Sequence, residues 1–166
     1  MDKTEAFDHA LGLGKLVGNL LEIEMGARIA IAKLNSQQGM QVRAQLPQVK
    51  EGEWVELNPF TNTCDLRQTL EVYNKCALPE CKLDIDPIVR LRDALAHGRM
   101  FGFGSESSRH LRILKFGRKA KNGQVQVTMV QDMTEDWFRT NIEMLMATLL
   151  KISQAMDYDV RELKSP

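Results

Sequence analysis

The sequence predicts an all-α fold: a bundle of amphipathic helices with one small β-hairpin inserted before the last helix. Apolar residues recur every three or four positions over long stretches at both ends of the chain, which is the period of a helix that buries one face. One region, residues 110–131, instead alternates around a turn sequence, as two paired strands do. Helices therefore dominate the expected fold.

Length and composition limit what the protein can be. A chain of 166 residues with 43% hydrophobic and 27% charged residues fits one globular domain with its own core, so we expect a single domain over residues 1–166. Lys+Arg and Asp+Glu number 22 each, and any binding of nucleic acid must therefore be local. The chain has neither the pattern of a signal peptide nor an apolar run near the about 18 residues of a membrane span. We expect a cytoplasmic protein that does not bind membranes.

The first predicted helix covers about residues 5–34. Its glycines, Gly12, Gly14, Gly18 and Gly26, do not match a dinucleotide-binding fingerprint, because the spacing differs and no strand precedes them. We interpret them as small residues that let another helix approach closely, within the chain or across a dimer.

Residues 37–62 form a long excursion without helical periodicity. Loops of this length often act as lids or partner surfaces, although a plain connection is also open. A short helix follows over residues 64–76, with Asn62 or Thr63 as its N-cap. We expect free thiols at the cysteines, because no second Cys or His pair completes a zinc site. They are Cys64, Cys76 and Cys81.

Three further elements complete the predicted order. Asp86 and Pro87 mark the start of a helix that ends at Gly98. Strands at 111–116 and 125–130 flank an Asn-Gly turn and form the hairpin within residues 110–131. Thr134 then caps the last helix.

The residues best suited to chemistry are Arg92, Asp93 and His97 on the third helix. Asp93 and His97 are four residues apart and share a face. A carboxylate there can accept the imidazole Nδ1 proton and, with the C-terminal end of the helix, favours the charged imidazole, which suits the histidine to proton transfer. Arg92 supplies a planar guanidinium for a phosphate. Such a pair can cleave RNA through its own 2′-hydroxyl, so we expect neither metal nor other cofactor.

The segment from Arg92 to Gly98 resembles the R-x4-6-H motif of HEPN domains. It has the arginine, a polar residue directly after it, a histidine after four intervening residues and then glycine. The resemblance implies a bundle of four or five helices that commonly dimerises, and a metal-independent endoribonuclease of the kind found among toxin and defence proteins. It makes Arg92 and His97 the catalytic pair and Asp93 the polar residue that supports them.

Two other interpretations stay open. Asp93 and His97 could form a structural pair, with Arg92 in a surface salt bridge. In that case the protein is a non-catalytic helical dimer that binds a protein partner, such as one half of a toxin-antitoxin pair, through residues 37–62. His9 and His110 have no comparable partners in the sequence, and we expect both to be solvated.

Basic residues concentrate around the predicted hairpin, with no acidic residue between positions 109 and 121. They could form a strip that follows an RNA backbone, or a solvated strand edge that resists aggregation. The predicted RNA-binding residues are Arg99, Arg109, Arg112, Lys115, Arg118, Lys119 and Lys121.

Overall fold

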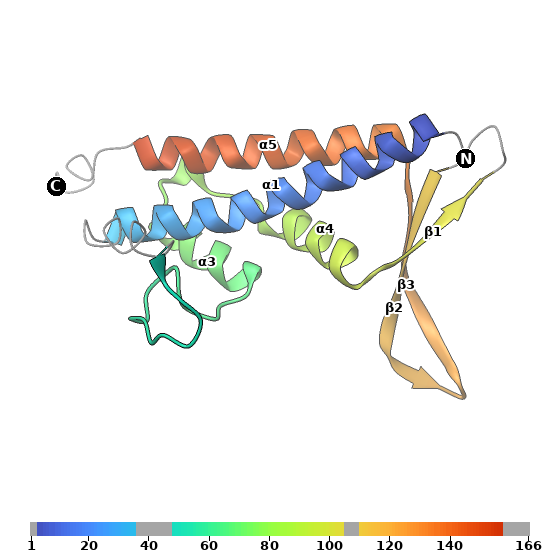
Figure 1. Cartoon of the computed structure of the whole chain (residues 1–166), viewed down its shortest axis with the longest axis horizontal. Coiled ribbons are helices and arrows are strands. Elements are labelled where there is room, and N and C mark those ends of the chain that lie inside the picture. The colour runs from blue at the N-terminus through green and yellow to red at the C-terminus, as the bar shows by residue number, and fades with distance from the viewer. Residues whose placement is uncertain (1–2, 36–47, 105–109, 158–166) are drawn as a thin grey trace. The chain divides into compact units, whose positions relative to one another are not determined.

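The computed structural model describes residues 3–35, 48–104 and 110–157, which contain four α-helices and three β-strands (Figure 1). The helices are α1 (Lys3–Asn35), α3 (Leu66–Cys76), α4 (Ile85–His97) and α5 (Glu135–Asp157), with a 3₁₀ turn at Pro79–Cys81. The strands are β1 (Arg99–Phe103), β2 (His110–Lys121) and β3 (Gln124–Met133). The protein is mostly helical, but its three-stranded antiparallel sheet makes the fold α+β rather than the predicted all-α.

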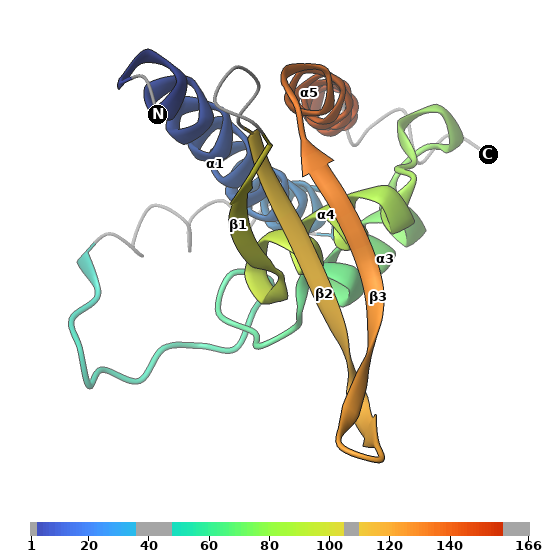
Figure 2. The same cartoon turned by 90° about the vertical axis from the view of Figure 1, so that its right-hand side faces the viewer.

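The predicted hairpin is confirmed and is longer than expected. Asn122 and Gly123 form the turn between β2 and β3 with φ values of 52° and 73°, because both central residues of this hairpin turn need positive φ. The sheet order is β1-β2-β3, so β2 lies in the middle (Figure 2). A register shift beside Phe116 makes the ladder irregular toward the turn.

The strand β1 was not predicted. It has five residues, contains Gly102 and begins at Arg99, with only Gly98 between it and the end of α4. So short a segment has little strand preference of its own, and its pairing with β2, from Arg99 opposite Leu114 to Phe103 opposite His110, holds it extended. The pairing with β2, and not the local sequence, therefore makes this segment a strand.

The chain forms two compact units. The first comprises residues 1–20 and 86–145 and includes α4 and the sheet, while the second comprises residues 21–85 and 146–166 and includes α3. The helices α1 and α5 each supply residues to both.

Glycines of α1 lie against α5 in each unit, as predicted for close helix packing. In the first unit a Cβ added at Gly12 would lie 2.7 Å from the Phe138 ring, and in the second a Cβ at Gly26 would lie 3.2 Å from Ile152. Nothing lies within 4 Å of such an atom at Gly14 or Gly18. Among the four glycines of α1, Gly12 and Gly26 therefore pack closely against other described residues.

Residues 48–64 of the second unit are held by a buried arginine, Arg28, which is 7% exposed. Its guanidinium donates to a carboxylate, a side-chain amide and two backbone carbonyls. The acceptors are Glu24 Oε1 at 2.9 Å, Asn62 Oδ1 at 2.8 Å, Pro59 O at 2.7 Å and Cys64 O at 2.9 Å. These hydrogen bonds therefore hold the C-terminal end of the predicted excursion 37–62. Residues 37–47 of this excursion lie outside the described residues.

Capping explains where two helices begin. Asp65 caps α3 through a capping box with Gln68, at 2.9 and 3.1 Å, so the predicted caps Asn62 and Thr63 were wrong. The Thr134 hydroxyl accepts a hydrogen bond from the Trp137 amide at 3.2 Å, which confirms the predicted cap of α5.

Candidate active site at the end of α4

The helix α4 positions all three residues predicted to do chemistry. Ile88, Leu91 and Ala94 are buried and form the face of α4 that packs inward. Arg92 and Asp93 lie beside that face and are partly exposed, at 43% and 36% of their side chains, while His97 is exposed in the last turn. The amphipathic pattern of α4 therefore presents these polar groups to solvent.

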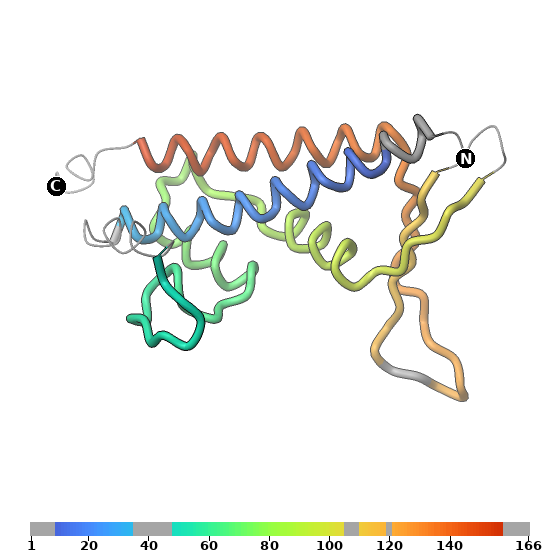
Figure 3. The backbone as a smooth tube through the Cα atoms, viewed as in Figure 1, coloured from blue at the N-terminus to red at the C-terminus, as the bar shows by residue number. Residues whose placement is uncertain are grey.

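The end of α4 is tied to the sheet through Gly98. Gly98 N donates to Ala94 O at 2.8 Å, and an added Cβ would overlap both Ala94 O and the side chain of Ile113 on β2. Gly98 does not adopt the left-handed φ expected of a helix-ending glycine. Its role is the close approach of the two elements, and the chain passes directly from α4 into β1 (Figure 3).

Asp93 contacts two cations and not the imidazole that we expected. Its Oδ1 lies 3.2 Å from Arg92 Nη1, and its Oδ2 lies 3.8 Å from Lys115 Nζ on β2. Within the described residues, the His97 side chain makes no hydrogen bond or ion pair. Asp93 thus lies between Arg92 and Lys115 of the sheet, and the His97 side chain is exposed to solvent.

This arrangement suits a phosphate diester. Among the described residues Arg92 donates to one carboxylate, that of Asp93, so most of its five N–H groups remain available to phosphate oxygens. Lys115 adds a second cation beside Asp93, and the exposed His97 can exchange a proton with a bound group. The end of α4 therefore offers a guanidinium and an exposed imidazole, groups that can bind a phosphate and transfer a proton.

The predicted RNA-binding residues have different surroundings. Arg112 pairs with Asp132 on β3, with its Nη2 at 2.8 Å from Oδ2, and Lys115 pairs with Asp93. Arg99, Arg118 and Lys121 are exposed. Arg109 lies outside the described residues, as does the side chain of Lys119.

The Arg112–Asp132 pair has a clear electrostatic effect. Hydrogen bonds from Arg112 hold the pKa of the Asp132 carboxyl below its usual range, with a further contribution from nearby His110. The same pair raises the pKa of Arg112. Both groups are therefore charged at neutral pH.

His110 was wrongly expected to be solvated, whereas His9 is half-buried. The His110 side chain is 19% exposed, and its Nε2 lies 3.5 Å from Asp132 Oδ2, within ion-pair range but without a hydrogen bond. Its ring meets Phe103 edge-on at 5.6 Å between centroids, and the ring of His9 lies 6.0 Å from that of Phe138. Strand pairing places His110 opposite Phe103, which could not be inferred without β1.

The sequence pattern had not suggested a role for the aromatic residues on β1. Phe101 and Phe103 are 49% and 46% exposed, and Arg112 lies over the Phe103 ring with Cζ 3.4 Å from its centroid. The signal was the alternation of Arg99, Phe101 and Phe103 at every second position, the period of a strand.

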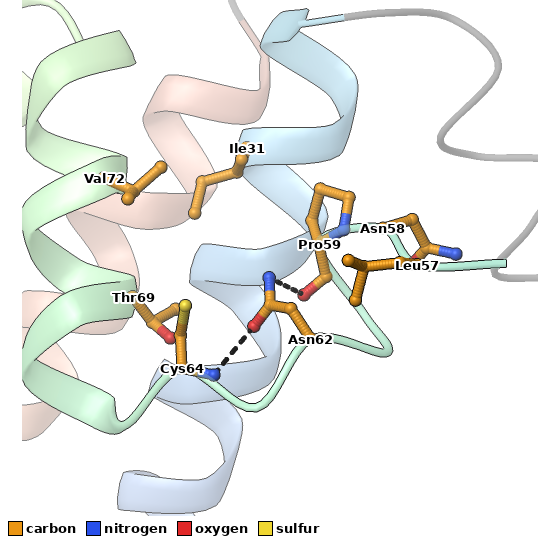
Figure 4. Close-up of a pocket in the computed structure, with 8 residues that line it drawn as sticks. All are labelled: Ile31, Leu57, Asn58, Pro59, Asn62, Cys64, Thr69 and Val72. Atoms are coloured by element: carbon orange, nitrogen blue, oxygen red, sulfur yellow. Dashed lines mark hydrogen bonds between the residues drawn. The ribbon is translucent and has the colours of Figure 1, made fainter.

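A second candidate site is a pocket of about 360 Å³ in the second unit (Figure 4). The Thr69 side chain on its wall is buried, and its hydroxyl oxygen has no hydrogen-bond partner in the described parts of the chain. The free thiol of Cys64 lies on the same wall. The pocket contains no histidine or arginine in its lining, so α4 is the stronger candidate for acid-base chemistry. Its lining residues are Ile31, Leu57, Asn58, Pro59, Asn62, Cys64, Thr69 and Val72.

Cys64, Cys76 and Cys81 form no disulfide bond with one another, as predicted. Among the described residues, no cluster of three or more histidine, cysteine or carboxylate side chains could hold a metal ion. None of the helices within residues 3–35, 48–104 and 110–157 combines the length and the apolar content needed to cross a membrane.

Comparison of the chain with protein-family models, curated proteins and solved structures found no match.

Proposed function

We propose that this protein is a metal-independent endoribonuclease of the HEPN type that acts as a toxin or defence protein. The observation that carries the proposal is that α4 exposes His97 and the guanidinium of Arg92 next to a strongly basic sheet. The order of residues from Arg92 to Gly98 resembles the family's motif, as the sequence analysis described. The proposed function rests on this exposed pair and on the resemblance of the motif together.

The proposed reaction is transesterification within RNA. His97 accepts the proton of the 2′-hydroxyl, whose oxygen attacks the adjacent phosphorus and forms a P–O bond. The bond from phosphorus to the 5′-oxygen breaks, and that oxygen takes the proton from the imidazolium of His97. The products are a 2′,3′-cyclic phosphate and a free 5′-hydroxyl. Arg92 stabilises the charge that develops on the phosphoryl oxygens, and Asp93 positions Arg92.

We also propose that the protein is a homodimer, with α1 in the interface. Leu11, Gly14 and Gly18 of the first unit follow a spacing of three and four and share one side of this helix. Leu11 is 47% exposed, and no described residue lies within 4 Å of a Cβ added at either glycine, so a second helix could approach closely. Light scattering at micromolar concentration measures the oligomeric state, and a monomer would contradict this part of the proposal.

The test of catalysis compares His97→Ala and Arg92→Lys with Arg90→Lys, a change at an exposed position of the same helix. Loss of the acid-base residue should reduce cleavage of RNA by about a hundredfold to ten-thousandfold. Arg92→Lys should also be impaired, because an ammonium cannot reproduce the guanidinium fork, whereas Arg90→Lys should cleave like the parent.

Parent cleavage should survive a chelator and leave cyclic-phosphate ends. Purified parent protein that leaves a broad panel of RNAs intact would refute the proposal. Full activity in His97→Ala would do the same.

A non-catalytic interaction module is the second candidate, and the side chains of residues 48–62 favour it. Trp54 is 101% exposed and Leu57 is 78% exposed, and large apolar residues in such positions mark protein-binding surfaces. A partner such as the other half of a toxin-antitoxin pair would cover them. An inactive parent whose His97→Ala variant has a lower melting temperature would favour this candidate, because His97 would then be structural.

A further inference from the structure

The three strands present a face that α4 does not cover. Residues paired directly across antiparallel strands point to the same side. Ile113 and Lys115 of β2 point toward α4, as their positions beside Gly98 and Asp93 show. The opposite side, here called the outer face, carries the alternate residues. They are Arg99, Phe101, Phe103, His110, Arg112, Leu114, Val130 and Asp132.

Aromatic rings and guanidinium groups lie together on the outer face. Arg112 covers the Phe103 ring, and its own guanidinium is fixed by Asp132. Arg99 lies over the ring of Phe116 with Cζ 5.2 Å from the centroid. Phe101 is 49% exposed, and none of the described residues stacks on its ring. The face thus offers one open ring and two guanidinium planes.

The net charge of the three strands indicates the kind of partner that the sheet would bind. The three strands hold six Lys and Arg residues and one acidic residue, a net charge of +5, although the whole chain has a net charge of zero. This charge belongs to the whole sheet, since the outer face itself carries Arg99, Arg112 and Asp132, and Lys115 points toward α4. Two copies meeting through the sheet would bring like charges together, whereas a polyanion would neutralise them. An apolar protein partner would leave the cations without counter-charges.

We propose that the outer face binds single-stranded RNA, with bases stacked on Phe101 and on the guanidinium of Arg112. Unpaired bases stack on aromatic rings and on arginine planes, whereas the bases of a duplex are already stacked on one another. The phosphates lie along the exposed Arg99, Arg118 and Lys121.

This inference rests on the proposed ribonuclease and names the form of its substrate. The edge strand β1 begins two residues after His97. RNA that contacts Arg99 on the outer face is therefore close along the chain to His97, while the Asp93–Lys115 contact lies on the other side of the sheet.

The test measures binding of a fluorescent 12-nucleotide 2′-O-methyl oligouridine to the full chain by anisotropy. The methyl group blocks the 2′-oxygen, so binding is measured without cleavage. Phe101→Leu, which removes the ring and keeps apolar bulk, should weaken binding roughly 5- to 100-fold. Phe101→Tyr, which keeps a ring, should stay within about twofold of the parent. The matched control is Met100→Leu on the other side of the same strand, which should also bind like the parent.

Salt dependence tests the phosphate contacts. Replacing Arg118 and Lys121 together by glutamine should reduce the slope of log affinity against log salt by about 1.4, or roughly 0.7 for each lost contact. Phe101→Leu should leave this slope unchanged, because stacking releases no counterions.

Three results would overturn the inference: unchanged binding in Phe101→Leu, equal loss in Met100→Leu, or tighter binding of a duplex of the same length. A change of oligomeric state in Phe101→Leu would instead assign the face to a second copy.

Cleavage assays separate the two proposals. Binding lost in Phe101→Leu with an inactive parent supports the outer face and refutes the ribonuclease, whereas an active parent with unchanged binding in Phe101→Leu does the reverse.

Discussion

Two arginines, Arg28 in the second unit and Arg92 in the first, show how surroundings decide what the same side chain does. Arg28 is 7% exposed and its guanidinium donates to four different residues. The Arg92 side chain is 43% exposed and donates to one neighbouring carboxylate. A saturated, buried guanidinium holds chain segments together, whereas an exposed one with free donors can bind a ligand. The contrast separates the structural region from the candidate active site.

The largest expected effect is on stability at Arg28. Arg28→Ala should reduce the free energy of unfolding by about 2 to 4 kcal/mol, because it removes the donor that joins Glu24 on α1 to the backbone carbonyls of Pro59 and Cys64. Arg92→Ala should cost less than about 1 kcal/mol, since its pair is largely solvated. Urea denaturation of both variants measures the difference. Equal losses would break the contrast between the two regions.

A smaller effect is expected where the backbone of the candidate site meets the sheet. Gly98→Ala should reduce the free energy of unfolding by about 1 to 3 kcal/mol, because its Cβ would overlap Ala94 O and Ile113. Gly102→Ala on β1 is the control, since nothing lies within 4 Å of an added Cβ there, and it should change stability little. Thermal unfolding of both variants tests this. A neutral Gly98→Ala would show that the end of α4 is not held against β2.

The smallest expected effect is a pH dependence in the sheet. Arg112 holds the pKa of Asp132 below the value of 3.8 that an unperturbed aspartate has. The pair therefore stabilises the folded state above pH 3.8, and this contribution is lost as the pH falls through 3.8 and then through the lower folded pKa. Asp132→Asn should be less stable than the parent near pH 6 and should converge with it in acid. Curves that stay parallel down to pH 2 would show that the pair does not contribute.

The pattern of the chain was enough to predict α1, α5 and the β2–β3 hairpin. Each rests on local features: apolar residues at helical spacing, the Thr134 cap and the Asn122–Gly123 turn. Such features act between residues close in sequence, so they can be recognised without knowing the tertiary structure. For the same reason the sequence placed Arg92, Asp93 and His97 on one helix.

Contacts between residues far apart in the sequence determined the features that were not predicted. β1 is a strand because β2 pairs with it, Asp93 contacts Lys115 because β2 passes beside α4, and His110 is shielded because Phe103 and Asp132 lie on the neighbouring strands. The partners of each contact are about 7 to 22 residues apart in the sequence, beyond the reach of helical periodicity. Local chemistry in the sequence determined which side chains α4 offers to solvent, and only the tertiary structure decided which neighbours they have, because strand pairing brings those neighbours together.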